Sequence, residues 1–212
     1  MLALLIETST ERGVVAVMRG EEVLFHSDLP FGYQNSQFLL PHIDAGLKKL
    51  GLVVRNFDYV AVGIGPGSYT GMRVGAATAK ALTFAAQKPL VGVCSLKIFM
   101  PHEDGPFAVL IDAKIGGAYM ITGHKDNQAI AYLTEPGVFP IEQLPSHLNG
   151  IQRLLTPNAK MIKAKLAEQA PELAVTWYEC PPDPRHMNSL AKASFDRNEF
   201  SRDGQLNLLY LR

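Results

Sequence analysis

The sequence predicts an α/β protein made of two halves that resemble each other. Short apolar segments with the spacing of β-strands alternate with longer segments in which apolar residues recur every three or four positions. A glycine-rich loop joins one such strand to the longest helical segment, and this β-loop-α-β order is typical of the α/β class. A run of three strands at the start of the chain also has a counterpart after residue 106.

In the first half, strands are expected at 2–6, 14–18 and 22–26. The polar segment 7–13 between the first two predicts a hairpin with a hydroxyl-rich turn. The next element is a predicted helix at 36–50, which ends at Gly51. Pro41 must lie in its first turn or kink it. Its apolar face is formed by Leu39, Leu40, Ile43, Leu47 and Leu50.

The β-loop-α-β unit follows, with a buried strand at 59–64, a tight loop at 65–71, an alanine-rich helix at 72–87 and a strand at 90–93. Turn-forming and charged residues at 100–106 then predict a linker. We therefore expect one domain at 1–102 and a smaller one at 103–212.

The second half repeats the opening meander, with strands expected at 107–111, 118–122 and 129–133. Asp112 takes the place of Glu7 at a strand end. The remaining predicted elements are helices at 160–169 and 188–197, a strand at 175–178 and an apolar tail at 206–211.

Composition narrows the function. The chain has 212 residues, 47% of them hydrophobic, with 20 basic and 20 acidic side chains. That balance lacks the basic surplus of an RNA-binding protein, so if RNA is the substrate, something other than this chain is expected to hold most of it. The N-terminus has no signal-peptide pattern, no segment suits a membrane span, and Cys94 and Cys180 have no disulfide or zinc spacing. A soluble, cytoplasmic protein is expected.

The loop Gly65-Pro66-Gly67-Ser68-Tyr69-Thr70-Gly71 has two interpretations. Its backbone could cradle a phosphate at the start of the next helix. It lacks the Walker and Rossmann spacings, however. The favoured interpretation is a sharp turn in which Ser68 or Thr70 caps the helix and the glycines allow close packing.

Catalytic residues are not evident. Glu7 and Asp112 could pair for metal binding or acid–base chemistry, although placement at strand ends is the favoured interpretation. Ser68 is outside a nucleophile-elbow pattern, and the six histidines have no metal-binding spacing. On the alanine-rich helix, Ala76, Lys80, Thr83 and Gln87 indicate either a protein interface or a half-solvated face.

Two motifs resemble those of the TsaB (YeaZ) family: Leu4-Leu5-Ile6-Glu7-Thr8-Ser9-Thr10 and Val62-Gly63-Ile64-Gly65-Pro66-Gly67-Ser68-Tyr69-Thr70-Gly71-Met72-Arg73-Val74-Gly75. Further likeness lies at 89–96, at 111–114 and in the closing Tyr210-Leu211-Arg212. Glu7 departs from the family pattern, which usually has Asp. The motif-loop residues are Gly65, Pro66, Gly67, Ser68, Thr70, Gly71 and Arg73.

The resemblance implies a duplicated actin-like ATPase (ribonuclease H-like) fold whose second subdomain is reduced. It also implies a non-catalytic subunit that dimerises with the TsaD catalytic homologue. Together with the ATPase TsaE, the complex transfers threonylcarbamoyl to N6 of the tRNA adenosine beside the anticodon. In the catalytic homologue an H-M-E-G-H stretch binds metal. The matching positions here are 95–99, which lack both histidines.

No intrinsic cofactor is therefore expected, and ATP and metal are expected on the partner subunits. The expected partner interface comprises Leu39, Ile43, Met72, Ala76, Lys80 and Thr83. The same helical face could form a homodimer when the chain is alone. The alternatives are a peptidase that acts on the partner and a nucleotide-dependent small-molecule kinase.

Overall fold

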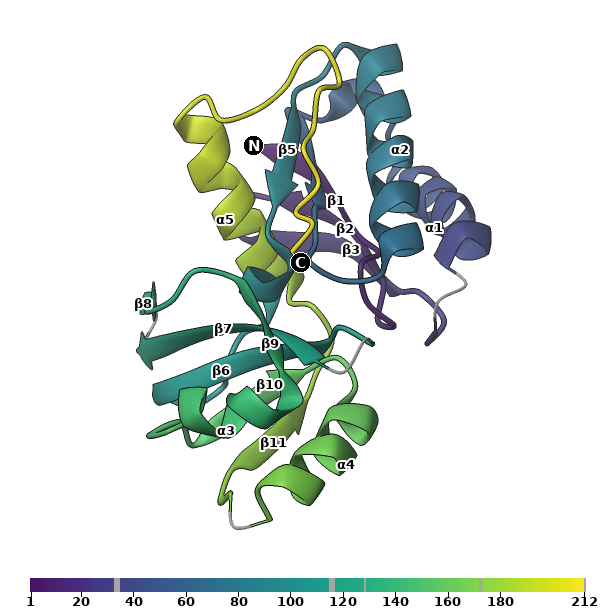
Figure 1. Cartoon of the computed structure of the whole chain (residues 1–212). Coiled ribbons are helices and arrows are strands. Elements are labelled where there is room, and N and C mark those ends of the chain that lie inside the picture. Colours follow the sequence, from purple (N-terminus) through teal and green to yellow (C-terminus); the bar gives the residue numbers. More distant parts are fainter. Residues whose placement is uncertain (33–34, 115–116, 128, 172, 212) are drawn as a thin grey trace.

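Two mixed β-sheets, each with its own helices, lie one above the other in the computed structural model (Figure 1). The structure describes residues 1–32, 35–114, 117–127, 129–171 and 173–211. The first sheet has the order β3-β2-β1-β4-β5. Its strands are β1 (Leu2–Glu7), β2 (Val14–Arg19), β3 (Glu22–Asp28), β4 (Tyr59–Gly63) and β5 (Leu90–Val93).

Helices cover both faces of this sheet. α1 (Asn35–Leu50) and α2 (Tyr69–Ala86) lie on one face, and α5 (Pro184–Asp196) lies on the other (Figure 1). Successive side chains of a strand point to opposite faces, so Leu4 and Ile6 of β1 pack under α1 and α2 while Leu5 packs toward α5. This explains why the strand is a continuous apolar run.

The second sheet has the order β11-β10-β6-β7-β8, and β9 also pairs with β7. Its opening meander is antiparallel, like that of the first sheet. The short helices η3 (Ile141–Gln143) and α3 (Leu144–His147) and the longer α4 (Ala159–Gln169) contribute to its core. Its strands are β6 (Gly105–Asp112), β7 (Gly117–Asp126), β8 (Ala129–Tyr132), β9 (Gly137–Pro140), β10 (Arg153–Thr156) and β11 (Thr176–Glu179).

The end of the chain returns to the first sheet. α5 is fastened there by a buried hydrogen bond of 2.7 Å from the Tyr59 hydroxyl to Asn188 Oδ1. The tail then runs along β5 toward the start of α2 (Figure 1). Backbone hydrogen bonds join Ser201 to Leu90 in both directions, and the Leu209 N–H donates to Ile64 O at 2.8 Å. The tail thus covers the open edge of β5, an edge that would otherwise expose unpaired backbone groups.

Several predicted boundaries need correction. α2 begins at Tyr69 because Ser68 caps it, and α5 begins at Pro184 because the Asp183 carboxylate accepts two backbone hydrogen bonds there. Pro41 lies beyond the first turn of α1, whereas Gly51 ends that helix with a φ of +63°. Strands β9 and β10 were not predicted. Among the described residues, no helix is both long and apolar enough to cross a membrane.

Candidate partner-binding surface

The glycine loop is tied to the turn between β1 and β2. The Ser68 N–H donates to Ser9 O at 2.6 Å, and the Thr8 hydroxyl donates to Gly71 O at 2.8 Å. Ser68 Oγ accepts from the Gly71 N–H at 3.2 Å, which confirms the predicted cap. A Cβ at Gly71 would overlap Thr8 O, so this close approach requires glycine. The loop therefore fixes where α2 starts.

Glu7 lies beneath this loop and is fully buried. Its carboxylate accepts hydrogen bonds from the Ser9 N–H and, at 2.8 Å, from Ser95 Oγ. Ser95 Oγ in turn accepts from the Gly65 N–H at 3.0 Å. Burial raises the pKa of Glu7 above its ordinary value. The Glu7 side chain therefore connects β1 to Ser95 and, through Ser95, to the glycine loop. It is enclosed by protein.

Asp112 has different partners. It accepts from the Lys114 N–H at 2.9 Å and pairs with Lys165 at 3.2 Å. It also lines a cleft of about 400 Å³ between the two halves, together with Ser9 and residues 67–70. Glu7 and Asp112 share no partner among the described residues, so these residues do not form a catalytic pair with a common contact. Their positions fit the alternative of placement at strand ends.

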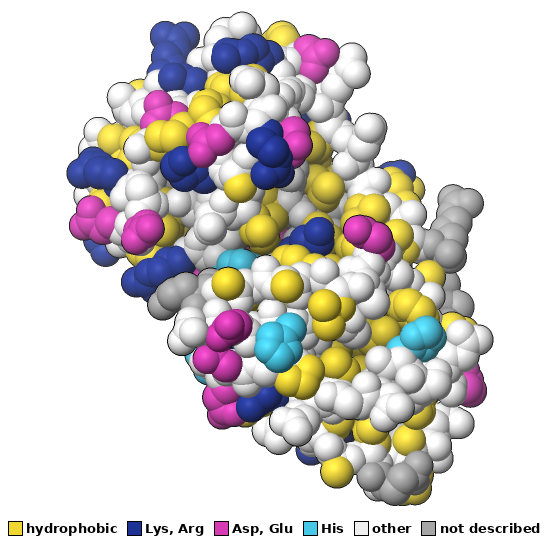
Figure 2. Space-filling view, turned by 90° about the vertical axis from the view of Figure 1, so that its left-hand side faces the viewer, with side chains coloured by type: hydrophobic (Ala, Val, Ile, Leu, Met, Phe, Trp, Pro, Cys, Tyr) yellow, Lys and Arg dark blue, Asp and Glu magenta, His cyan; other side chains and the backbone are white. Residues whose placement is uncertain are grey.

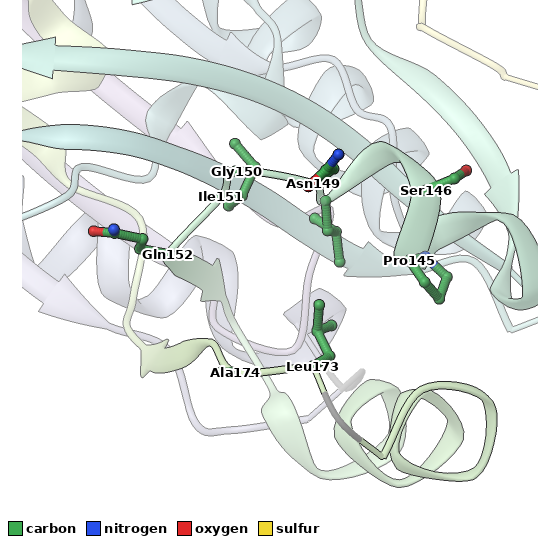
Figure 3. Close-up of a pocket in the computed structure, with 9 residues that line it drawn as sticks. Pro145, Ser146, Asn149, Gly150, Ile151, Gln152, Leu173 and Ala174 are labelled. Atoms are coloured by element: carbon green, nitrogen blue, oxygen red, sulfur yellow. The ribbon is translucent and has the colours of Figure 1, made fainter.

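A second hollow, of about 680 Å³, opens in the second half (Figure 3). It is lined by residues of α3 and of the segment that follows it, and by Leu173 and Ala174 before β11. Among the described residues, its polar side chains are those of Ser146, Asn149 and Gln152, and none carries a charge. Of the described residues that line this hollow, none offers a carboxylate, an imidazole or an amine for acid–base chemistry.

The predicted interface side chains on α1 and α2 need correction. Leu39, Ile43, Met72, Ala76 and Thr83 are buried inside the chain itself, and Lys80 is half-buried. The same 3.6-residue spacing that suggested a docking face marks the side of each helix that packs on the first sheet. Contact with a partner at these helices would use their outward sides.

The outward side of α2 carries small and apolar residues. Thr70, Arg73, Ala77, Ala81 and Phe84 recur every three or four positions and are all exposed. Phe84 is 67% exposed, the largest value among the large hydrophobic residues that the structure describes. On the neighbouring α1, Leu40 is 56% exposed. We call these outward sides of α1 and α2 the docking face.

Arg73 is held at the start of this face by two tyrosines. Its guanidinium lies 3.7 Å from the centre of the Tyr69 ring, and its Nε donates to the Tyr210 hydroxyl at 3.2 Å. Arg73 and Tyr210 belong to two separate motifs of the sequence, and only the path of the tail brings them together. Arg212, in the same closing motif, lies outside the described residues.

The segment matched to the metal-binding stretch of the catalytic homologue is η2 (Ser95–Ile98) with Phe99. Ser95, Leu96, Ile98 and Phe99 are all fully buried, and the three apolar ones belong to the core that joins the two halves. Across the described residues, no group of three or more His, Cys, Asp or Glu side chains is placed to hold a metal ion. The segment contributes packing.

Comparisons with known proteins agree with these motifs. A family model described as "TsaD: tRNA N6-adenosine threonylcarbamoyltransferase" matches residues 34–132. The "tRNA threonylcarbamoyladenosine biosynthesis protein TsaB" of Haemophilus influenzae is 35% identical over 122 residues, which is 55% of this chain and 51% of that protein. The Escherichia coli protein of the same name is 32% identical over 61% of this chain and 58% of its own length. Over the matched residues, the chain is similar to the TsaB (YeaZ) family.

The matched stretch spans about half the length of these curated relatives. Structural likeness extends further. "YeaZ from Pseudomonas aeruginosa" has a TM-score of 0.82 and 23% identity, with 99% of each chain covered. A likeness of this kind shows the fold, and it confirms the predicted α/β architecture of two halves, each with a mixed sheet.

Proposed function

We propose that this chain is the non-catalytic subunit of the complex that transfers threonylcarbamoyl to N6 of the tRNA adenosine beside the anticodon. Similarity to TsaB proteins supports the pathway, since those relatives carry the description of a tRNA threonylcarbamoyladenosine biosynthesis protein. The chain's own role in that complex is to dimerise with a TsaD-type catalytic subunit through the docking face and to hold it in an active form.

The observation that carries this proposal is the exposed row on α2. Ala77 and Ala81 let a second helix approach closely, and Phe84 supplies a large apolar ring at one end of the row. Exposed aromatic side chains beside small residues are typical of surfaces that a partner covers. A helix of the catalytic subunit laid on this row would bury it.

Chemistry is left to the other subunits. The segment 95–99 supplies no pair of side chains that could replace two histidine ligands. Its serine is hydrogen-bonded to Glu7, and its three apolar residues are buried in the core. We therefore place ATP and metal on the TsaD-type and TsaE-type subunits. The tRNA is held by the complex, since acidic and basic side chains are interspersed on the face seen in Figure 2 and the whole chain is neutral.

An alternative function is that of a peptidase that acts on the partner, and one side-chain contact favours it. Ser27 Oγ lies 2.7 Å from His42 Nδ1, which is a possible nucleophile–base distance. Among the described residues, however, no carboxylate pairs with His42 to orient it, as a catalytic triad requires. The contact joins β3 to α1. If the partner is cleaved by the wild type but not by Ser27→Ala, the peptidase reading holds.

Reconstitution tests the proposal. Purified chain given threonylcarbamoyl-adenylate and tRNA should yield no modified adenosine when the tRNA is digested and its nucleosides are separated. Addition of the homologous TsaD-type subunit and the TsaE-type ATPase should produce it, and omission of this chain should abolish it. Modification by the lone chain, or full activity of the other subunits without it, would contradict the proposal.

A further inference from the structure

Arg73 is an exposed cation whose orientation is already fixed. Its guanidinium stacks on Tyr69 and its Nε is occupied by Tyr210, so the side chain cannot sweep freely as an ordinary surface arginine does. Tyr69 and Tyr210 also contact each other, with ring centres 5.6 Å apart. Within the part of the chain that the structure describes, the two terminal nitrogens of Arg73 form no ion pair, and their planar fork matches a carboxylate.

Among residues 1–32, 35–114, 117–127, 129–171 and 173–211, the chain itself does not supply that carboxylate. Within the described ranges, no acidic side chain forms an ion pair with Arg73. The sequence of α2 contains Arg73 and Lys80 but no Asp or Glu. On α1, the single acidic residue is Asp44, and it already pairs with Lys48 at 2.7 Å. The docking face therefore has a surplus of positive charge.

We propose that Arg73 receives an Asp or Glu carboxylate from an acidic helical surface of the catalytic partner, and that this pair sets the partner's register on α2. The inference rests on the proposed function and names the chemistry that the partner must present. Arg73 lies at one end of the exposed row and Phe84 at the other, so the charged contact and the apolar contact together fix position along the helix. Tyr69 and Tyr210 act as positioning residues for the guanidinium.

An RNA phosphate is a weaker match for this site. Phosphate-backbone binding relies on several cations spread along a groove, whereas Arg73 is flanked by aromatic rings and small side chains. Arginine with tyrosine in an otherwise apolar patch is the composition of a protein-interface hot spot.

A second copy of the chain also fits poorly. In a symmetric dimer through this face, each copy would bring only cations from α2 and an already paired Asp44 from α1. Like charges would then oppose one another across the two-fold axis, while an acidic partner would neutralise them. The charge pattern thus favours the heterodimer over self-association.

The test is calorimetric titration of the TsaD-type subunit with Arg73→Gln, Arg73→Lys and Tyr210→Phe, at low and at raised ionic strength. Arg73→Gln should weaken binding by about tenfold or more and reduce its salt dependence. Arg73→Lys should recover part of the loss, since it keeps the charge but not the fork. Tyr210→Phe should weaken binding less, because it removes only the orienting hydroxyl. Charge reversal to Arg73→Glu should be rescued by an acid-to-arginine change on one helix of the partner.

Ala77→Arg separates the possible failures. If Ala77→Arg loses the partner while Arg73→Gln binds like the wild type, the docking face stands and the role of Arg73 is overturned. If both variants bind like the wild type, the docking face is wrong and the proposed function must use another surface. If Arg73→Gln leaves the heterodimer intact but weakens tRNA binding by the complex, Arg73 serves RNA and the inference fails. Unchanged thermal unfolding of each variant is the folding control.

Discussion

The hydroxyl of Ser95 donates a hydrogen bond of 2.8 Å to the buried carboxylate of Glu7, although the two residues are 88 positions apart in the sequence. This contact joins β1 to the segment after β5, and the Gly65 N–H joins the same network from above. The start of α2, and with it the docking face, is therefore positioned from the interior of the first sheet.

Glu7→Gln should flatten the pH dependence of stability. Burial raises the pKa of Glu7, so the folded state holds its proton more tightly than the unfolded state, in which the pKa is near the ordinary 4.5. The free energy of unfolding of the wild type should therefore be highest below that value and fall as pH rises through the folded-state pKa. Glutamine keeps the acceptor for Ser9 and removes the charge. Urea unfolding from about pH 4 to about pH 8 measures this.

The matched control is Glu22→Gln, because Glu22 is an exposed carboxylate on β3. Its profile should run parallel to that of the wild type. A Glu7→Gln profile that is also parallel to the wild type would show that Glu7 does not carry a raised pKa.

Arg12 should couple the two halves. Its Nε donates to Pro157 O at 2.7 Å, and its Nη2 lies 2.6 Å from Glu179, which in turn accepts from the Ala159 N–H at the start of α4. A double-mutant cycle of Arg12→Ala and Glu179→Gln should give a coupling of about 0.5–1 kcal/mol, since both side chains are partly exposed.

The exposed pair Arg197 and Glu199 provides a comparison, because it lies within one half and is more open to solvent. Its cycle should give a smaller coupling. Equal couplings for the two pairs would mean that the contact of Arg12 across the halves is no stronger than an ordinary surface pair.

Asn188→Ala should destabilise the fold by about 2 kcal/mol, because it leaves the buried Tyr59 hydroxyl and the carbonyl of Gly20 without partners. Adding Tyr59→Phe should restore part of the loss by removing the unpaired hydroxyl. Thermal unfolding of both variants measures the change. Asn149→Ala, at an exposed position, is the control. An equal loss of stability in that variant would show that the loss in Asn188→Ala does not come from the buried hydrogen bonds.

Much of the first sheet could be predicted because its strands either bury both faces, and are then continuous apolar runs, or alternate strictly between apolar and polar residues. β1, β4 and β5 are apolar runs bounded by polar or glycine residues, and their limits differ by at most a residue or so from those observed. β10 escaped prediction because only the two central residues of Arg153-Leu154-Leu155-Thr156 are apolar, so the segment shows neither an apolar run nor an alternation. The return of α5 and the tail to the first sheet is a long-range packing event that leaves no local signature.

The candidate surface could be predicted only to the level of the helix. Helical spacing identified α1 and α2 as amphipathic, but the regular apolar positions, such as Ile43 and Met72, turned out to be the inward side. The outward row of α2 differs less in hydrophobicity from the rest of the helix, because alanine and threonine are common on either side of a helix. The meeting of Arg73 with Tyr210 depends on the tail, which lies 137 positions further along the chain.

The most direct test of the central claim is the dissociation constant of the heterodimer formed by this chain and the TsaD-type subunit, measured for Ala77→Arg and for Ala129→Arg. Both alanines are exposed, the first on the docking face and the second on β8 in the other half. Ala77→Arg should weaken binding by about a hundredfold, since it places a bulky charge against a close-packed partner helix, while Ala129→Arg should bind like the wild type. Wild-type affinity of Ala77→Arg would contradict the claim that the outward side of α2 holds the catalytic subunit.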